Sequence, residues 1–318
     1  MFYIQRLFIS VLIASVSLVT GCSVVTSEFE STWHERCRWI PENYFSDEKV
    51  IALCHAIEAD DLKEIDRLVA AGADVNAKGK GNMTPLLWAF PDNKPERFKR
   101  LLEHGADPNV MVTDDFNTRS AIKAGDSITH MSARTWFPDH FKYVMQHGGD
   151  ANLVHPEYES TPLFSVIEGS GRNKEERVRL LIEKGADLNR KSLGATPAMQ
   201  AVSWFGQYRI ALMLLEAGAD PTVYASRQEA RLIHMVVFSE KRVPIESEQQ
   251  KQDRAMLIAW LEQHGESFAA AREDAARWAG TSSKSPTELK ELRRAEIAAR
   301  HAREAAERQL DAGGNVVE

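Results

Sequence analysis

The chain has ten histidines and three cysteines, residue types that commonly bind metal ions or carry out proton and thiol chemistry. His104, His147 and His264 each stand directly before a glycine, where a side chain can meet the carbonyls that end a helix. His34 and His55 lack the HExxH spacing of a zinc site. Because the cysteines form no CxxC pair, the sequence predicts no metal site and no redox-active dithiol.

A serine nucleophile has no better support. Ser170 lies in "EGSGR", which differs from the GxSxG turn of serine hydrolases and does not follow a strand-like run. The sequence also contains no GxxxxGK[ST] loop and no GxGxxG loop for phosphates. We therefore expect a protein that is not an enzyme and that has no cofactor and no small-molecule substrate.

Composition and charge narrow the class further. Hydrophobic residues make up 43% of the 318 residues and charged residues 27%, which is typical of a globular protein with a packed core. The formal net charge is −7. A nucleic-acid-binding protein needs a basic face to neutralise phosphates, so we expect no nucleic-acid partner.

A short phrase recurs along the chain, and it is structural rather than catalytic. "LLEHGADPN" at 101–109 returns in variants such as "LVAAGADVN" and "LLIEKGADLN". Its glycine stands at Gly72, Gly105, Gly148, Gly185, Gly218 and, in a degraded copy, Gly265. A second phrase precedes it: "TPLLWA" from Thr84, "TPLFSV" from Thr161 and "TPAMQA" from Thr196, with weaker copies from Ser127 and Arg231. Threonine and the proline after it favour the start of a helix, and glycine favours its end.

These two phrases, at a fixed offset, resemble the ankyrin-repeat family over residues 50–268. The resemblance implies an all-α solenoid of stacked helix pairs, with about six units including the caps. It places His130 and His234 at a structural histidine position of the repeat. Fifteen inserted residues at 112–126 lengthen one turn; they are either a surface extension or an addition near the binding face.

The first residues are typical of an exported protein. "LFISVLIASVSLV" is an uncharged run that is short for a membrane span and suited to a signal peptide. The "VTGCS" after it resembles the lipobox of bacterial lipoproteins, which implies lipid on Cys22. An ordinary cleaved signal peptide is the alternative. Ser23 after this cysteine implies the periplasmic face of the outer membrane of a Gram-negative bacterium.

The chain then divides into a signal peptide (1–21), a linker or capping segment (22–49), the repeats (50–268) and a helical tail (269–318). In an oxidising compartment we expect a disulfide between Cys37 and Cys54, with two separate buried thiols as the alternative. The tail is rich in Ala, Glu and Arg. It is either a solvated helix or an arm that meets a partner.

Family resemblance also places the partner contacts, on the concave face of the solenoid. Contact positions near the ends of the first helices are Ser203, Trp204, Glu168, Arg134 and the adjoining Trp136 and Phe137. Contact positions at the hairpin tips are Lys80, Met83, Tyr158 and Leu193. Exposed aromatic residues are good anchors for a partner. The alternative is that these rings only fill the space between first and second helices.

The sequence therefore predicts a lipid-anchored periplasmic protein that binds another protein. Lipid-anchored repeat proteins of this kind resemble immunity proteins that inhibit phospholipase effectors of type VI secretion, so a toxic lipase is the expected partner. The alternative is a scaffold or stress-related accessory protein of the envelope with no toxin partner.

Overall fold

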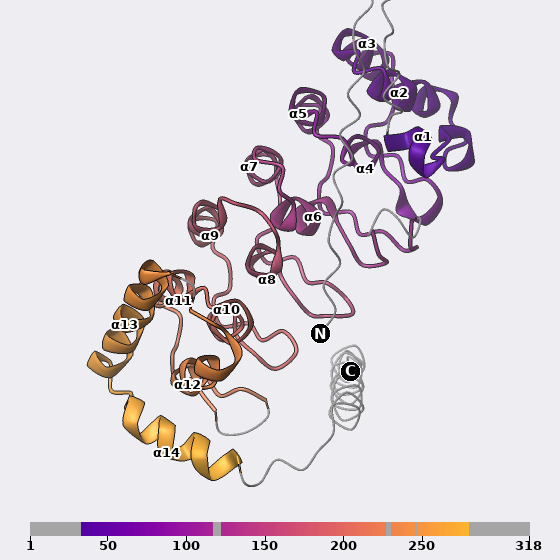
Figure 1. The fold of residues 1–318 in the computed structure, drawn as a ribbon. Helices are drawn as coiled ribbons and strands as arrows, with labels where there is room; N and C mark the ends of the chain where they lie inside the picture. Colours follow the sequence, from indigo (N-terminus) through magenta and orange to yellow (C-terminus); the bar gives the residue numbers. More distant parts are fainter. Residues whose placement is uncertain (1–32, 117–121, 227–229, 246, 280–318) are drawn as a thin grey trace, which may run out of the picture. The chain divides into compact units, whose positions relative to one another are not determined.

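The structure of the protein is a computed structural model that describes residues 33–116, 122–226, 230–245 and 247–279 (Figure 1). All of them belong to one compact unit of the chain. The predicted signal peptide, the lipidation site Cys22 and most of the predicted tail lie outside the described residues. Within the described ranges, no helix combines the length and apolar character needed to cross a membrane.

The described residues form helices joined by turns, and their β pairing is limited to two isolated bridges. The α-helices are α1 (Trp33–Cys37), α2 (Glu48–Glu58), α3 (Leu62–Ala70), α4 (Pro85–Ala89), α5 (Pro95–Glu103), α6 (Ile128–Arg134), α7 (His140–Gln146), α8 (Pro162–Glu168), α9 (Lys174–Glu183), α10 (Pro197–Phe205), α11 (Tyr208–Glu216), α12 (Leu232–Arg242), α13 (Glu248–Gln263) and α14 (Phe268–Ala279). Two 3-10 turns, η1 (Pro41–Asn43) and η2 (Lys80–Asn82), lie near the N-terminal end.

The helices stack as pairs, and the pairs form two rows. An inner row contains the even-numbered helices from α2 to α12, and an outer row contains the odd-numbered helices from α3 to α13 (Figure 1). Each helix packs against its pair mate, and α14 closes the row by packing on α12. The six pairs confirm the predicted all-α solenoid. The ring of Trp278 in α14 lies 4.9 Å from the ring of His234 in α12.

The threonine-proline starts explain most of the inner helices. Thr84 Oγ1 accepts the backbone N–H of Leu87 at 3.1 Å, and Ser127 Oγ accepts that of His130 at 3.2 Å. Thr161 differs, because its hydroxyl is buried without a hydrogen-bond partner. Thr161 therefore does not cap α8 through its side chain, and the proline after it favours the helix start.

The repeated "GAD" phrase does more than end a helix. Gly105 has φ of 83°, and a Cβ there would meet nothing within 4 Å, so left-handed backbone rather than crowding is what favours glycine. Asn76, one unit earlier, donates from Nδ2 to the carbonyl of Gly105 at 2.9 Å and accepts the N–H of Asp107 at 2.7 Å. Asn109 and Asn152 make the same pair of bonds to the next units. The phrase therefore links neighbouring units through a ladder of asparagine side chains.

Two buried arginines join the rows. Arg177 of α9 is 4% exposed and donates to the carbonyls that end α6: Nη1 to Ser132, Ala133 and Thr135 at 2.7–3.1 Å, and Nη2 to Phe137 at 2.7 Å. Arg97 of α5 occupies the same place in its unit and donates to the carbonyl of Ile57 at 2.8 Å. Free helix-terminal carbonyls attract cations, so both side chains stabilise an inner helix of the preceding unit.

The N-terminal end is closed by aromatic rings. Trp39 is buried and lies 5.4 Å from the ring of Trp88, and His34 donates to the carbonyl of Trp88 at 2.7 Å. In the same region Cys37 and Cys54 are separate buried thiols, so the predicted disulfide is absent from this structure. Burial raises the pKa of the Cys54 thiol well above its ordinary value, so this cysteine packs as a small apolar group.

The described parts of the insertion, residues 112–116 and 122–126, lie against the same end. Phe116 is buried, with its ring 6.2 Å from Trp39, and it forms an isolated bridge with Ile122. The returning segment brings Lys123 and Asp126 to the start of α6. The described residues of the insertion thus pack against the solenoid and contribute side chains beside the inner helices.

Candidate protein-binding face

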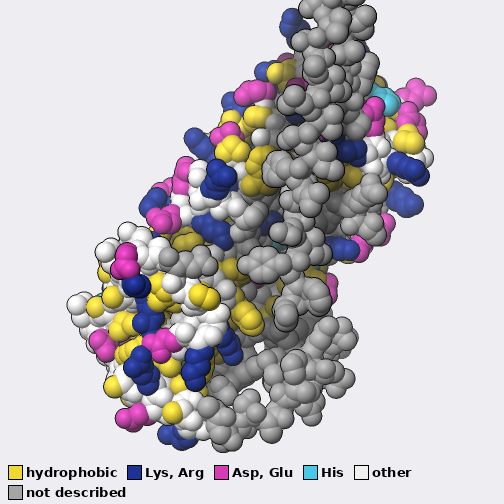
Figure 2. Space-filling model, viewed as in Figure 1, with side chains coloured by type: hydrophobic (Ala, Val, Ile, Leu, Met, Phe, Trp, Pro, Cys, Tyr) yellow, Lys and Arg dark blue, Asp and Glu magenta, His cyan; other side chains and the backbone are white. Residues whose placement is uncertain are grey.

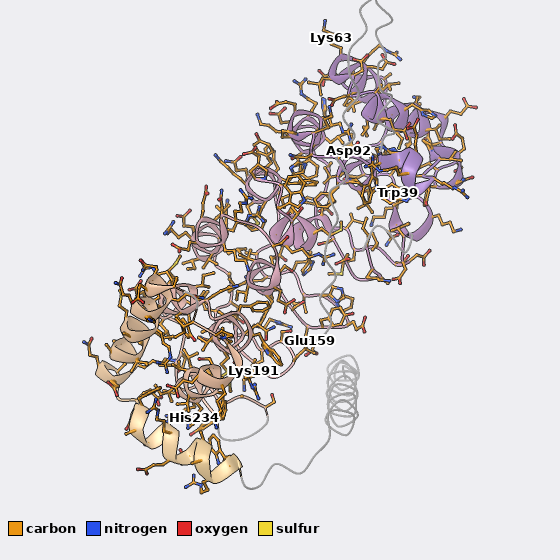
Figure 3. All side chains as sticks on the ribbon, in the orientation of Figure 1. Trp39, Lys63, Asp92, Glu159, Lys191 and His234 are labelled. Carbon is orange, nitrogen blue, oxygen red and sulfur yellow. The ribbon has the colours of Figure 1, made fainter. Side chains whose placement is uncertain are left out.

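We call the surface formed by the C-terminal ends of α6, α8 and α10 and by the loops 152–160, 188–195 and 222–226 the inner face. The loops extend away from the outer helices, as the labelled Glu159 and Lys191 show (Figure 3). Over the described surface seen in Figure 2, basic and acidic side chains are interspersed. That mixture, with the net charge of −7, does not favour binding to a phosphate backbone.

Exposed aromatic side chains concentrate on this face. Trp136, just after α6, is 64% exposed, and Trp204, in the last turn of α10, is 65% exposed. Tyr158 and Leu193 are also exposed, at the tips of successive loops. These four predicted contact residues are available to a partner, as are Lys80 and Glu168, while Arg134 is half-buried. The alternative that both tryptophans fill the interior is wrong.

Three predicted contact residues are not available. Met83 is fully buried ahead of the cap of α4, and Ser203 is buried against the neighbouring inner helices. Phe137 packs between the rings of Phe90, at 5.8 Å, and His140, at 4.8 Å. Family positions indicate where the backbone approaches the face. They do not indicate which way each side chain turns.

A cavity of about 560 Å³ opens beside Trp136. Trp136 and Phe137 form one wall, and Trp33 and Arg36 of α1 lie on another, with Phe90 beyond. α1 carries no repeat signature, so sequence reasoning missed its residues. The lining is mostly apolar, and its volume lies within the range of about 300–1,000 Å³ that is usual for ligand sites. The cavity can accept a large apolar side chain.

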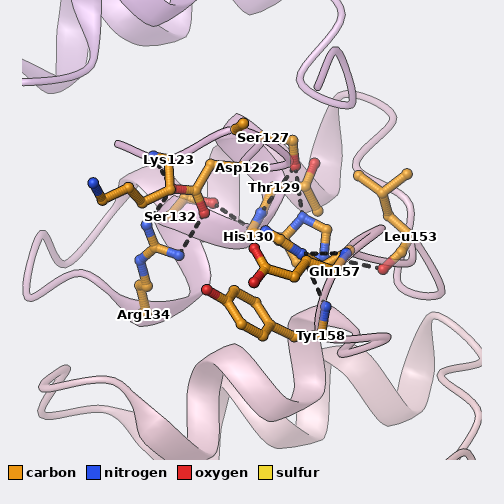
Figure 4. Close-up of polar contacts among 12 residues, drawn as sticks. Lys123, Asp126, Ser127, Thr129, His130, Ser132, Arg134, Leu153, Glu157 and Tyr158 are labelled. Atoms are coloured by element: carbon orange, nitrogen blue, oxygen red, sulfur yellow. Dashed lines mark hydrogen bonds and ion pairs between the residues drawn. The ribbon is translucent and has the colours of Figure 1, made fainter. Parts of the chain in front are cut away.

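A second, more polar hollow of about 360 Å³ lies between α6, α8 and the loops; we call it the recess (Figure 4). Asp126, which is 2% exposed, accepts two hydrogen bonds from the guanidinium of Arg134, at 2.7 and 2.8 Å. Arg134 is thereby held in place by a bidentate ion pair. Lys123 at the rim donates to Asp115 at 2.7 Å.

The two histidines of the recess hold its walls together. Ser127 Oγ lies 2.9 Å from His130 Nδ1, and His130 Nε2 donates to the carbonyl of Leu153 at 3.1 Å. His155 Nδ1 accepts the N–H groups of Glu157 and Tyr158 at 3.2 and 3.3 Å. Burial lowers the pKa of His130 to about 4 and also lowers that of His155, so both are neutral near pH 7. Their roles are structural.

Between the two tryptophans, the end of α8 packs closely against α6. A Cβ on Gly169 would stand 2.5 Å from Arg134 Cα, so only glycine lets the end of α8 approach α6 this closely. Glu168 precedes this glycine and accepts a hydrogen bond from Gln200 Nε2 at 2.8 Å. Desolvation by the surrounding walls raises the pKa of Glu168, although the bond from Gln200 and nearby cations oppose this. Inner helices 8–10 Å apart would place the two tryptophans roughly 20 Å from each other.

Two basic side chains lie beside Trp204 and the neighbouring Phe205. The guanidinium of Arg242 lies 5.8 Å from the ring centroid of Trp204, and Lys174 Nζ lies 5.5 Å from that of Phe205. Lys174 also donates to the carbonyl of Ile167 at 2.7 Å.

Tyr224, in the last of the three loops, is a further exposed ring that sequence reasoning missed, although an aromatic residue in a polar loop was the available signal. Within the described ranges, no cluster of three or more His, Cys, Asp or Glu side chains is arranged to hold a metal ion.

Comparison with known proteins agrees with this geometry. Residues 129–225 match the family model for ankyrin repeats in three copies. The fold is an ankyrin-repeat solenoid. Ankyrin-repeat folds generally act as protein-interaction scaffolds without catalysis of their own. The repeats therefore indicate a protein-interaction module.

Similar proteins share the repeats but not the whole chain. A putative ankyrin repeat protein, R664, of Acanthamoeba polyphaga mimivirus is 38% identical over 64 residues, which cover 20% of this chain and 40% of that protein. The mitochondrial disaggregase of Homo sapiens is 40% identical over 70 residues, which cover 22% of this chain and 10% of that protein. The chain thus spans less than half the length of each of these relatives.

Solved structures show the same fold at low identity. The ankyrin repeat domain of Bcl-3 superposes with a TM-score of 0.51 at 19% identity, covering 68% of this chain and 86% of that domain. An ankyrin repeat domain from Acinetobacter baumannii superposes with a TM-score of 0.52 at 22% identity, covering 65% of this chain and 96% of that domain. These likenesses concern the architecture of the repeats.

Proposed function

We propose that this protein binds another protein through its inner face, with Trp136 and Trp204 as the principal anchors. The observation that carries the proposal is that both rings are about two-thirds exposed at the ends of inner helices, one of them beside an apolar cavity. Fully burying a large apolar side chain contributes about 1.5–3 kcal/mol. Aromatic residues that become buried in a complex are often its energetic hot spots.

The proposed setting is the periplasmic face of the outer membrane of a Gram-negative bacterium, with the protein held there by lipid on Cys22. The support is the apolar run followed by "VTGCS" in the sequence. A tether of this kind would raise the effective concentration of the inner face near the membrane. Mass spectrometry of the protein purified from its native membrane tests this, because lipid-modified Cys22 should be the first residue. An unmodified residue at the N-terminus would contradict it.

The proposed biological role is immunity: the protein inhibits a toxic phospholipase delivered by type VI secretion. A repeat face tethered beside the membrane that such an enzyme attacks could cover the active site of the enzyme. Support comes from the combination of lipobox and inner face. A periplasmically targeted toxic lipase from the same genome, produced with and without this protein, tests the role. Survival that depends on this protein supports it, and equal killing in both strains contradicts it.

A scaffold or stress-related accessory role in the envelope is the second candidate. The observation that favours it is the 40% identity with part of a mitochondrial disaggregase, a protein whose name refers to protein aggregates. This role predicts that deletion sensitises cells to envelope stress without any toxin present. Normal growth of the deletion strain under oxidative and heat stress would contradict it.

The binding proposal is tested by recovering proteins from a native membrane fraction with wild-type bait and with bait that carries Trp136→Ala and Trp204→Ala. The matched control is Met256→Ala, because Met256 is 49% exposed on the outer helix α13. We expect one protein recovered at equal ratio by wild type and by the control and lost with the double variant. Equal recovery by all three baits would contradict the role of the inner face.

A further inference from the structure

The recess has an unbalanced set of charges. Its cations are already engaged: Lys123 with Asp115, and Arg134 with the buried Asp126. Nearby Lys174 donates to a backbone carbonyl. Both histidines are neutral near pH 7. The carboxylate of Glu168, which lines the recess, accepts a hydrogen bond from neutral Gln200 and forms no salt bridge with a described residue.

The recess also has an aromatic wall. Tyr158 is 43% exposed, and its ring lies 4.7 Å from that of His155, which holds it in place. Figure 4 shows the Tyr158 ring and the Asp126–Arg134 pair, which line the recess together with Glu168. Glu157 lies close enough to contribute, after desolvation, to raising the pKa of Tyr158. A flat ring beside a carboxylate suits the stem and the head of a long basic side chain.

The volume of the recess and its place between the two tryptophans both suit a single side chain of a bound protein. A hollow of about 360 Å³ lies near the lower end of the range for ligand sites, which suits one side chain better than a folded segment. Glu168 ends α8, in the unit between those that supply Trp136 and Trp204. A protein that covers both tryptophans must therefore pass over the recess. The net charge of −7 also favours a basic partner during encounter.

We propose that the recess receives a lysine or arginine side chain of the bound protein, with its charge beside Glu168 and its stem against Tyr158. This inference rests on the proposed binding function and specifies the chemistry of the partner. The partner then combines apolar groups for the two tryptophans with a protruding basic residue between them. The bidentate pair with buried Asp126 holds the Arg134 guanidinium in place and offsets its charge, which reduces its repulsion of the added cation.

The test uses a display library of random peptides selected on the purified protein. We expect the selected peptides to share a lysine or arginine and to lose affinity about 10- to 100-fold when citrulline or glutamine replaces it. Glu168→Gln retains the size of the side chain and removes its charge. On this variant the same replacement in the peptide should change affinity less than threefold. The control Glu183→Gln, on the outer helix α9, should behave as wild type.

A second measurement does not depend on the variants. The carboxyl carbon of Glu168, followed by NMR, should report a pKa above the ordinary glutamate value in the free protein and a lower pKa with a selected peptide bound. Selected peptides without a basic residue, or an unchanged Glu168 titration in the complex, would overturn the inference and leave the binding function intact. If the protein selects no peptide at all, the binding function fails and the inference fails with it.

Discussion

His140 predicts that the solenoid loses stability in mild acid. Its ring is fully buried among Phe90, Phe98 and Phe137, and neither ring nitrogen has a hydrogen-bond partner. Burial, together with the charges of Arg97 and Arg177 on the flanking helices, lowers the pKa of His140 from 6.5 to about 4. Because the folded-state pKa is lower, the unfolded chain binds more protons between these pH values. The free energy of unfolding therefore falls as pH falls from about 6.5 to 4.

The size of the effect follows from the two pKa values. The full difference corresponds to about 3 kcal/mol, of which about 2 kcal/mol is lost by pH 5. Replacing the ring by a similar apolar one, His140→Phe, removes this proton linkage and leaves no unsatisfied nitrogen. We expect the variant to be at least as stable as wild type at pH 7 and clearly more stable at pH 5.

Urea unfolding followed by circular dichroism at a series of pH values checks this prediction. A matched control is His55→Gln, since the hydrogen bonds of His55 to Glu42 and Glu58 raise its pKa. A raised pKa stabilises the folded state in acid, so this control should retain or increase the acid sensitivity. Equal dependence of stability on pH in wild type and His140→Phe would refute the reasoning about burial.

Four further substitutions test the links between units and the capping of the inner helices. Arg177→Leu should lower the free energy of unfolding by at least about 3 kcal/mol, because it leaves buried helix-terminal carbonyls without donors. Thermal or urea denaturation measures the loss, and a loss below about 1 kcal/mol would contradict the capping role. Asn152→Ala should cost about 1–2 kcal/mol and speed hydrogen exchange at the Asp187 amide, which loses its acceptor; unchanged exchange would refute the ladder. Thr84→Val should cost about 1 kcal/mol while Thr161→Val should be neutral or stabilising, because only Thr84 caps its helix; equal losses would contradict the assignment.

The recurring elements could be predicted from the sequence because they are local. The threonine-proline start, the apolar spacing and the glycine end each act within one helix, so the six helix pairs follow from the printed letters. The asparagine ladder could not be predicted, because each asparagine bonds to groups about one unit away in the chain. Arg97 and Arg177 likewise look like solvated residues at the starts of helices, and only the stacking of units buries them.

The candidate face could be predicted in part, because some of its residues stand at fixed positions of the repeat. Trp136 and Trp204 stand at repeat positions that fix the backbone, and they proved exposed. Met83 at a hairpin tip and Phe137 after α6 also stand at predicted contact positions, but both side chains are buried. Trp33, which lines the cavity beside Trp136, lies outside the repeats, so the repeat pattern could not predict its contribution.

Photo-crosslinking in the native cell tests the central claim most directly. Benzoylphenylalanine placed at position 204 on the inner face, or at position 256 on α13, reports which surface contacts another protein. The account predicts a discrete crosslinked product, containing one partner, from Trp204→benzoylphenylalanine and none from Met256→benzoylphenylalanine. A product from position 256 with none from position 204 would contradict binding through the inner face.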